Sequence, residues 1–353
     1  MKKKFSHLFM FILGTLILLG LTFGTGTSAI QAADTINLTY GGIWPPPEVH
    51  PMSAATKLWI EKIEKETQGR VKIKAFWAGA MYKAKDSALE LARGVTDIGG
   101  ISGSYAPVGY DFEKSMRMAF WGVNDRKLAR KVYLEMVAKY PQLEDEFTSS
   151  GVKVMAYAGI PPYNLLLAKK LVTKADDLKG MTIKATGDLT RVAAAFGGEG
   201  INMPMGETYT ALQKTTIDGA FAPYETMKSF RFAEVIKYAL ELNLGSAPAG
   251  HWGFCLKSWD KLPPDIQKVF EDNKEWFGQK IEELVFANDE LGVNFAKENN
   301  VEFIKLPTEE LDKIYAVVDN IILEQMGDLD AKGLPGTAVY KDIRRLIKEY
   351  GGN

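Results

Sequence analysis

The stretch Ser53–Phe76, SAATKLWIEKIEKETQGRVKIKAF, places a helix directly before a strand and decides the fold class. Ser53 can cap the helix, which is predicted to run to about Gln68 and to end at Gly69. The apolar residues that fall four positions apart on one face of this helix are Ala55, Trp59 and Ile63. Lys72–Phe76 then follows as a strand in which apolar and lysine side chains alternate. A helix followed at once by a strand indicates an α/β layer fold.

The same alternation continues along the chain. A second helix is predicted at 86–93, an apolar strand follows at 98–101, and Asp125 can cap a helix that ends near Lys139. Further strands are predicted at 152–158, 181–185, 217–222 and 301–304, and further helices after Asp188 and at 207–214. For residues 233–242 the pattern leaves helix and strand open. The whole chain therefore has the pattern of an α/β protein.

Two loop-like interruptions divide this pattern. The first is Ile160–Tyr163, which contains two consecutive prolines, and the second is Ser246–Gly250. We therefore expect two lobes, made of residues 34–160 with 248–290 and of residues 161–247 with 291–353. The longest helical stretch starts behind Pro263-Pro264 and runs from about residue 265 to 299. A helix of that length can act as a spine packed against both lobes.

Residues 1–33 have the three-part layout of a cleavable export signal. The lysines Lys2 to Lys4 precede the apolar run Leu8–Phe23, and small residues ending in Ala32-Ala33 follow before Asp34. A transmembrane anchor is the alternative, but the apolar run is short for a span of about 20 residues. We expect cleavage near Ala32-Ala33 and a mature protein that lies outside the cytoplasm and is not embedded in a membrane.

The composition is that of an ordinary globular protein, with 46% hydrophobic and 25% charged residues. The formal net charge is −1, and it becomes −4 when the three lysines of the export signal are removed. Such a mild charge indicates neither nucleic acid nor a membrane surface as a partner. Cys255 is the single cysteine, so no intrachain disulfide can form, and its apolar neighbours indicate a buried, unreactive thiol.

The chain lacks the short motifs that mark common enzymes and metal sites. His50 and His251 are about 200 positions apart, and no His-Glu-x-x-His occurs. Gly100–Ser104 misses the Gly-x-Ser-x-Gly elbow by one glycine, and no Walker loop or dinucleotide-binding glycine motif is present. We therefore predict no catalytic residue, no metal and no cofactor. A receptor whose two lobes close around a ligand fits this pattern, and a secreted enzyme with a carboxylate pair is the less favoured alternative.

Five motifs stand in order along the chain. They are Gly69–Ile73, Ala175–Ile183, Met203–Gln213, Ile217–Gly219 and Trp259–Pro263. They resemble motifs of the DctP-type solute-binding proteins of TRAP (tripartite ATP-independent periplasmic) transporters, and the resemblance runs from about Asn37 into the last fifth of the chain. It implies the two-lobed periplasmic-binding-protein fold with a hinge and a spine helix. It also implies capture of a small solute in the periplasm and its delivery to the membrane subunits of the transporter.

The sequence departs from the family pattern at three positions of the ligand site. Many members bind a carboxylate through an arginine directly after the Asp-Leu-Lys-Gly turn, and Lys184 stands there in this chain. A second arginine of many members falls near Asn164, and the family's Gln-Glu-Asn-Pro reads Ala220–Pro223 here. Lysine offers a point charge in place of the planar fork of arginine. Arg191 could supply the missing guanidinium, with an ordinary surface position on a helix as the alternative.

The candidate ligand-binding residues combine these positions with aromatic and polar side chains near the lobe crossings and strand ends. They are Trp44, Trp121, Tyr163, Asn164, Lys184, Arg191, Phe221, Tyr224, Glu225 and Trp252. For each of them, core packing, a turn or a solvated surface is the competing interpretation. We expect a small monocarboxylate with an apolar or aromatic body, anchored by Lys184 and Arg191. A neutral or cationic solute paired with Glu225 is the alternative.

Overall fold

The helix and the strand predicted at Ser53–Phe76 both form, and the helix begins earlier than expected. They are α1 (Pro51–Glu66) and β2 (Val71–Phe76). The N-cap is His50 instead of Ser53, because the imidazole Nδ1 accepts the backbone N–H of Met52 at 3.3 Å. Proline directly after the cap favours this start, since its fixed φ and missing N–H suit the first helical position. The predicted apolar face is buried at Ala55, Trp59 and Ile63.

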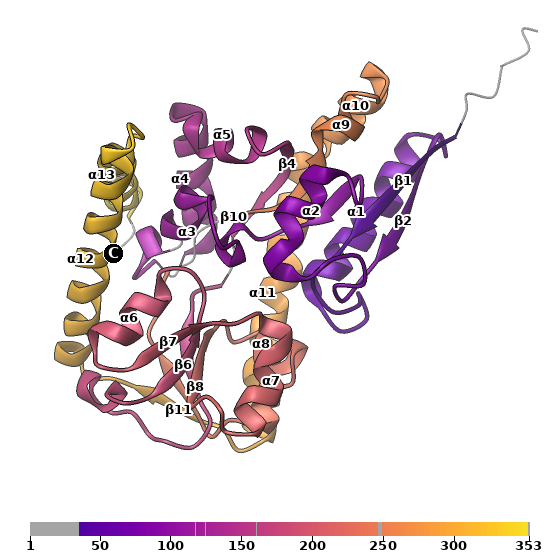
Figure 1. The fold of residues 1–353 in the computed structure, drawn as a ribbon. Helices are drawn as coiled ribbons and strands as arrows, with labels where there is room; N and C mark the ends of the chain where they lie inside the picture. The colour runs from indigo at the N-terminus through magenta and orange to yellow at the C-terminus, as the bar shows by residue number, and fades with distance from the viewer. Residues whose placement is uncertain (1–34, 117, 124, 160, 246–248, 352–353) are drawn as a thin grey trace, which may run out of the picture. The chain divides into compact units, whose positions relative to one another are not determined.

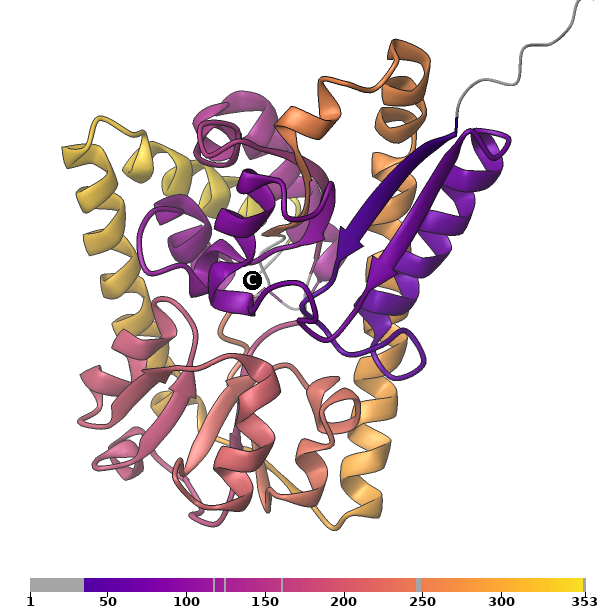
Figure 2. The same ribbon diagram turned by 45° about the vertical axis from the view of Figure 1, so that its right-hand side comes forward.

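The computed structural model describes residues 35–351 apart from residues 117, 124, 160 and 246–248. Residues 35–353 group as one unit in space, shown in two orientations in Figures 1 and 2. The export signal predicted at residues 1–33 lies outside the described residues. Within the described part, no helix combines the length and the apolar character that crossing a membrane requires.

The first sheet of the described chain has the strand order β2-β1-β3-β10-β4. The strands that join β2 in it are β1 (Ile36–Gly41), β3 (Ile98–Gly100), β4 (Val152–Ala158) and β10 (Ala249–Cys255). β1 runs parallel to β2 and β3, and β10 is antiparallel to β3 and β4. We call the part of the chain that forms this sheet and its helices the first segment, and the part that forms the other sheet and its helices the second segment. Besides α1, the helices of the first segment are α2 (Ser87–Arg93), α3 (Asp111–Met116), α4 (Arg126–Lys139) and α5 (Gln142–Thr148). The predicted cap of α4 is confirmed, since Asp125 Oδ1 accepts the backbone N–H of Leu128 at 3.1 Å.

The second sheet has the strand order β11-β9-β5-β8-β6-β7. Its strands are β5 (Asn164–Leu167), β6 (Thr182–Ala185), β7 (Glu199–Asn202), β8 (Gly219–Ala222), β9 (Tyr238–Glu241) and β11 (Glu302–Lys305). β6 is parallel to β7 and β8, whereas β5 is antiparallel to β8 and β9. The helices of this segment are α6 (Leu189–Ala195), α7 (Met205–Gln213) and α8 (Thr226–Ser229). The ambiguous residues 233–242 contribute the end of a short 3-10 turn and then β9.

The chain passes between the two sheets close to the two predicted interruptions, of which residues 160 and 246–248 lie outside the described residues and residues 249–250 belong to β10. β4 ends in the first sheet and β5 begins in the second, and the chain returns between β9 and β10. The two crossings are hydrogen-bonded to each other: Leu244 N–H donates to the carbonyl of Tyr163 at 2.9 Å, and Tyr163 N–H donates to the carbonyl of Gly245 at 3.3 Å. Two adjacent chain crossings of this kind form a hinge about which the two sheets can rotate.

The predicted spine helix is present but broken. One helix was expected from about residue 265 to 299, whereas the structure has α10 (Pro264–Asp272) and α11 (Lys274–Glu298), separated at Asn273. The Asn273 side chain explains the break, because its Nδ2 donates to the carbonyl of Val269 at 2.8 Å and competes with the regular helical pattern. α11 alone is the spine: it packs on α1 and β4 and also on α8 of the second segment (Figures 1 and 2).

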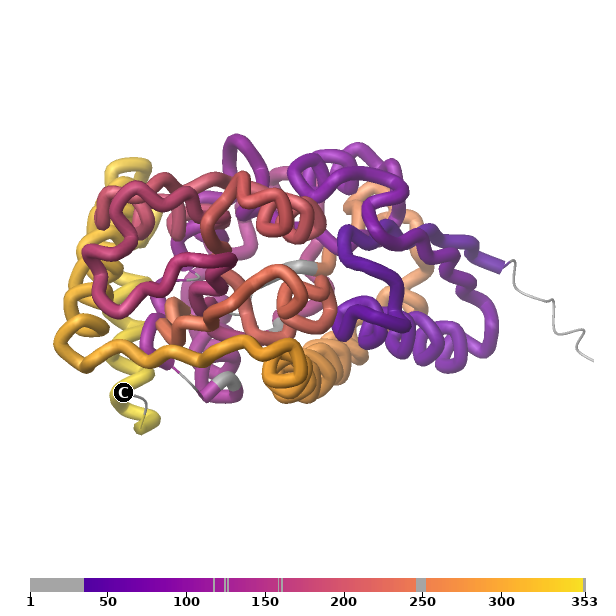
Figure 3. Tube along the Cα trace, turned by 90° about the horizontal axis from the view of Figure 1, so that it is seen from below, coloured from indigo at the N-terminus to yellow at the C-terminus, as the bar shows by residue number. Residues whose placement is uncertain are grey.

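The last two helices contact both segments. α12 (Thr308–Ala331) packs on α6 and α3, and α13 (Gly336–Glu349) packs on α4. In Figure 3 these C-terminal helices, drawn in yellow, lie at the end of the protein opposite to β1 and β2. Residues 291–353 were expected with the second lobe, and α13 also contacts α4 of the first segment. The lobe boundaries remain a proposal.

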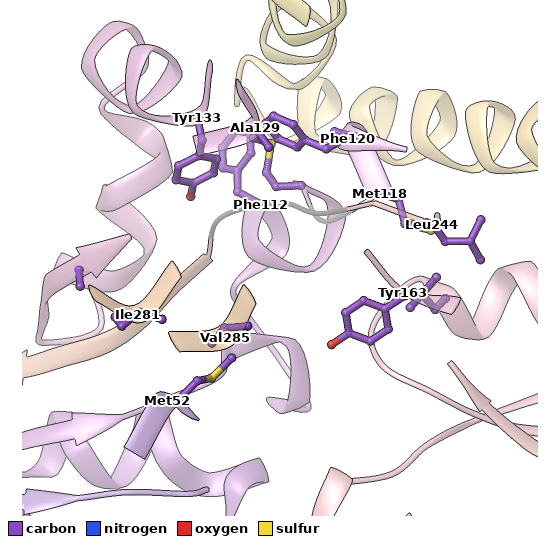
Figure 4. Close-up of a cluster of buried hydrophobic side chains, with 14 of the residues drawn as sticks. Met52, Phe112, Met118, Phe120, Ala129, Tyr133, Tyr163, Leu244, Ile281 and Val285 are labelled. Carbon is purple, nitrogen blue, oxygen red and sulfur yellow. The ribbon is translucent and has the colours of Figure 1, made fainter. Parts of the chain in front are cut away.

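The largest hydrophobic cluster runs through both segments of the described chain. Figure 4 shows part of it, with Met52 from α1 and Val285 from α11 on one side and Tyr163 beside the first crossing. Cys255 is buried, as the sequence predicted. The elements not yet named are the short helix α9 (Leu256–Trp259) and 3-10 turns at Ala84–Asp86, Gly103–Tyr105, Met118–Phe120, Ala175–Leu178 and Phe232–Glu234. The predicted α/β fold is therefore confirmed.

Candidate functional site

A pocket lies where the loops of the first segment meet those of the second. It encloses about 570 Å³ of space outside protein atoms, part of which is open solvent. The described residues that line it are Ile43, Trp44, His50, Met52, Ser102, Tyr105, Pro161, Tyr163, Met205, Pro223, Glu225, Thr226 and Phe230. Most of these side chains are apolar or aromatic and a few are polar, which is the usual make-up of a small-molecule site.

One wall of the pocket is a row of aromatic rings. The Trp44 ring stacks on the His50 ring with centroids 6.3 Å apart, and Phe230 meets His50 edge-on at 5.3 Å. Behind this row, Trp252 lies 5.1 Å from Trp44. Trp44 reaches its position because Gly100 has no side chain: a Cβ there would lie 2.4 Å from Cζ3 of the Trp44 ring. The row offers flat apolar surface to the body of a ligand.

Glu225 is the acidic group of the pocket. It precedes α8, is only 3% exposed, and its Oε2 accepts a hydrogen bond from Ser229 Oγ at 2.5 Å. Burial raises the pKa of Glu225 to about 8, and the nearby carboxylate of Asp289 raises it as well, whereas the bond from Ser229 lowers it. At neutral pH the carboxyl group of the ligand-free protein is therefore largely protonated.

His50 is uncharged at the same pH. Burial lowers the pKa of His50 to about 3, because the imidazolium form loses its hydration. Its Nδ1 accepts the N–H of Met52, which places the proton of the neutral ring on Nε2. Lysine and arginine are absent from the described residues that line the pocket, so this lining carries no fixed positive charge.

Three of the ten predicted site residues line the pocket: Trp44, Tyr163 and Glu225. Trp252 lies directly behind them and is fully buried, with its Nε1 donating to Thr56 Oγ1 at 2.9 Å. Trp252 therefore supports Trp44 from the core side.

Asn164, Phe221 and Tyr224 lie near these residues but outside the lining. Asn164 Oδ1 accepts the backbone N–H groups of Leu242 at 2.8 Å and Asn243 at 3.1 Å, which joins the start of β5 to the second crossing. Phe221 is fully buried in β8. The Tyr224 ring packs edge-on against Phe303 at 5.6 Å. The sequence predicted contacts with a ligand for these three side chains. In this structure Asn164 joins the two crossings, Phe221 packs in the largest hydrophobic cluster, and Tyr224 packs against a separate, smaller cluster.

Lys184, Arg191 and Trp121 are not brought together at the pocket. Lys184 is fully buried in β6 and its Nζ donates to Thr186 Oγ1 at 2.9 Å. Arg191 is partly exposed on α6 and forms an ion pair with Glu324 of α12. The indole of Trp121 packs under the guanidinium of Arg344 at 4.2 Å and donates from Nε1 to Tyr340 Oη at 3.2 Å, so it anchors α13.

Sequence reasoning missed several lining residues, among them His50 and Phe230 of the aromatic row. His50 lies six residues after Trp44, a predicted site residue, and this proximity in the sequence was the available indication. Phe230 directly follows α8, and it resembles any core phenylalanine in the sequence. Its position beside the pocket depends on the contact between α8 and α11.

The described residues contain no group of three or more His, Cys, Asp or Glu side chains that could hold a metal ion. Among the described lining residues, Glu225 is the single carboxylic acid. A glycosidase mechanism needs two carboxyl groups that flank the scissile bond. The lining therefore gives no support to the alternative of a cleft enzyme with a carboxylate pair.

Comparison with known proteins identifies relatives over most of the chain. The model of the DctP family, described as bacterial extracellular solute-binding protein, family 7, matches residues 41–328. The 2,3-diketo-L-gulonate-binding periplasmic protein of Escherichia coli is 24% identical over 297 residues, which make up 84% of this chain and 87% of that protein.

Solved structures agree with the observed fold. A TRAP periplasmic solute-binding protein from Desulfovibrio salexigens has a TM-score of 0.74 at 26% identity, covering 90% of this chain and 97% of the other. That structure is an open complex with the C-terminus of a symmetry mate in its ligand-binding site. A TRAP solute-binding protein from Rhodoferax ferrireducens, in complex with copurified benzoate, has a TM-score of 0.77 at 22% identity, covering 89% and 98%. The predicted two-lobed fold is confirmed.

Proposed function

The chain belongs to the DctP family of bacterial extracellular solute-binding proteins, family 7, and we propose that it captures a small organic solute with an apolar or aromatic body for a TRAP transporter. The resemblance inferred from five sequence motifs is confirmed by the family match. In the proposed cycle, the solute enters between the two sheets in the periplasm. The lobes then close about the hinge, and the closed form docks on the membrane subunits.

The observation that carries this proposal is the placement of the pocket. Its lining comes from both segments, and the two crossings beside it are hydrogen-bonded to each other. A solute that contacts both walls would favour the closed arrangement, because it gains contacts with the second wall only when the lobes approach. The row of Trp44, His50 and Phe230 supports an apolar or aromatic body. The benzoate of the Rhodoferax protein shows that one relative of this fold accepts such a body.

Two ways to anchor the solute follow from the sequence, and the structure bears on both. A monocarboxylate was expected to pair with Lys184 and Arg191, but Lys184 donates to Thr186 and Arg191 pairs with Glu324. The alternative solute, neutral or cationic, was expected to pair with Glu225, which lines the pocket. The placement of Glu225 supports the second kind of anchor.

The variant Lys184→Met separates the two anchors. If Lys184 held a ligand carboxylate, the loss of one charge-assisted contact of about 1.5–3 kcal/mol would weaken binding by roughly tenfold to a hundredfold. We expect instead that Lys184→Met binds the solute within threefold of wild type, measured by titration calorimetry. A loss of tenfold or more would restore Lys184 as the anchor.

The receptor role itself is tested by binding and closure. A thermal-shift screen of organic acids, aromatic acids, diols and amines should find a solute that stabilises the protein, by about 2.7 kcal/mol at 100 times its dissociation constant. That solute should reduce the radius of gyration in small-angle X-ray scattering, because the lobes approach each other. Unchanged scattering at saturation would contradict a closing receptor. Chemical conversion of the solute would favour the enzyme alternative.

A further inference from the structure

A buried acid, Glu225, borders the pocket, and one of its two carboxyl oxygens accepts no hydrogen bond from a described residue. Oε2 of Glu225 accepts the bond from Ser229, and no hydrogen bond from a described residue reaches Oε1. Glu225 is only 3% exposed, yet it is one of the residues that line the pocket. Its side chain therefore borders the space that a ligand would occupy. No salt bridge joins Glu225 to a lysine or arginine of the described chain. The charge of its ionised form is therefore left without a cation from those residues.

The neighbourhood of Glu225 adds negative rather than positive charge. On α11, Asp289 Oδ1 accepts the backbone N–H of Glu225 at 2.8 Å. Across the pocket stands neutral His50. On the 3-10 turn that packs against α8, Glu234 is already paired with Arg231, and Lys228 of α8 is exposed to solvent. A carboxylate ligand would meet Glu225 at this wall, with Asp289 behind it, and no lysine or arginine among the described lining residues.

Aromatic faces next to an acid favour a cation. The faces of Trp44 and Phe230 carry the negative part of the ring quadrupole, which attracts an ammonium group. An ammonium also has N–H donors for the free Oε1 of Glu225, and such a charge-assisted bond is stronger in a site shielded from water. The same pocket offers an anion only uncharged donors, from hydroxyl groups, the His50 imidazole and the protonated carboxyl group of Glu225.

Resting on the receptor role proposed above, we propose that the solute carries a protonated amine that pairs with ionised Glu225, while the rings of Trp44 and Phe230 hold its apolar body. Binding then removes a proton from Glu225, because the ligand-free carboxyl group is mainly protonated at neutral pH. The amine supplies the positive charge that the described lining lacks. Glu225 is thus the residue that selects the charge of the solute.

Matched probes test this assignment. Each probe set is a primary amine, an alcohol and a carboxylate on the same apolar body, with 2-phenylethylamine, 2-phenylethanol and phenylacetate as one set and alkyl and cycloalkyl sets beside it. Titration calorimetry of the wild-type protein should show at least one amine that binds about tenfold or more tightly than its alcohol, with the carboxylate weakest. The inference is overturned if a carboxylate is the tightest member of every set that binds, or if no amine binds.

The variant Glu225→Gln keeps the shape and an oxygen for Ser229 but removes the charge. It should weaken the best amine by about tenfold or more and leave the matching alcohol within threefold. Glu234→Gln is the control, because it removes one acidic charge from the neighbouring exposed turn; it should leave both affinities unchanged. Equal losses for amine and alcohol in Glu225→Gln would mean a structural role for Glu225 and would overturn the inference.

If Glu225→Gln does not fold, the pH dependence of amine binding by the wild-type protein tests the inference. The amine affinity should rise by nearly tenfold per pH unit between about pH 6 and about pH 7.5, because binding releases the Glu225 proton. Calorimetry in buffers of different ionisation enthalpy should detect close to one proton released. His50 stays neutral throughout this range. A flat or falling affinity would overturn the inference.

The receptor role is a separate question. It would survive that result if a carboxylate bound to the protein and closed it, and it would fail only if no solute did so.

Discussion

The backbone N–H of Glu225 donates a 2.8 Å hydrogen bond to the carboxylate of Asp289. This bond joins the start of α8 to the spine helix α11, so a pocket residue is fixed by the helix that contacts both segments. α11 makes room for the contact at Gly292, where a Cβ would lie 2.2 Å from the carbonyl oxygen of Tyr224. The position of the acid therefore depends on close packing between two elements far apart in the sequence.

Removing the Asp289 acceptor should destabilise the protein. In Asp289→Ala the buried N–H of Glu225 loses its partner, which costs about 1–3 kcal/mol. Asp289→Asn keeps an oxygen acceptor and should lose less. Urea denaturation of both variants measures the difference, and an equal loss in the two would show that the negative charge, not the hydrogen bond, matters. Asp289→Asn should also lower the pKa of Glu225, since the Asp289 charge helps to raise it.

A side chain at Gly100 should displace Trp44. In Gly100→Ala the new Cβ would meet the indole at 2.4 Å, so the ring must move away from the pocket wall. We expect a loss of stability of about 1–3 kcal/mol and weaker binding of the solute found by thermal shift. Gly206→Ala is the matched control, because no atom lies within 4 Å of its added Cβ. Wild-type affinity in Gly100→Ala would show that the Trp44 ring does not contact the solute.

Two tryptophans that the sequence placed in one site should behave differently. Trp121→Ala removes the packing under Arg344 and the hydrogen bond to Tyr340, which should cost about 1–3 kcal/mol in thermal or urea unfolding. Its solute affinity should stay within threefold of wild type, since Trp121 does not line the pocket. Trp44→Ala should show the opposite pattern, with a clear loss of affinity. A tenfold loss of affinity in Trp121→Ala would contradict this assignment.

The stability of the protein should depend on pH through Glu146. Its carboxylate accepts the N–H groups of Phe112 and Glu113 at the start of α3, while burial and the charge of Glu113 raise its pKa to about 8. A raised folded-state pKa means that its contribution is complete below about pH 4.5 and is lost as the pH rises toward 8. Across that window Glu146 should account for a fall of up to about 1.4 kcal/mol per pH unit.

Glu146→Gln tests this dependence, because glutamine keeps one oxygen acceptor and cannot ionise. Urea denaturation at several pH values should show a smaller fall of stability between about pH 5 and about pH 8 than in wild type. Glu225, whose pKa is also raised to about 8, contributes to the slope that remains. Parallel curves for wild type and Glu146→Gln would exclude Glu146 as a source of the pH dependence.

Local patterns in the sequence predicted a helix, strand or cap correctly where the residues that stabilise it are close together in the sequence. The alternation in β2, the buried face of α1 and the Asp125 cap of α4 all formed as predicted. Two predictions of the same kind were wrong. Ser53 was displaced as a cap by His50, and the predicted spine helix breaks at Asn273. Asn273 also donates from Nδ2 to Glu66 at the end of α1, a contact that exists only when the two helices pack.

The sequence by itself determined the fold class, the family and the approximate places where the chain crosses between sheets, because these depend on periodicity, turn residues and the order of motifs. Only the tertiary structure decided which candidate side chains face the pocket. Trp44, Trp121 and Trp252 are chemically alike, yet the first lines the pocket, the second packs on Arg344 and the third is buried behind the first. Their roles are set by contacts with residues far away in the sequence, such as Gly100, Arg344 and Thr56. The spacing of residues along the chain does not indicate which of these distant residues will be in contact.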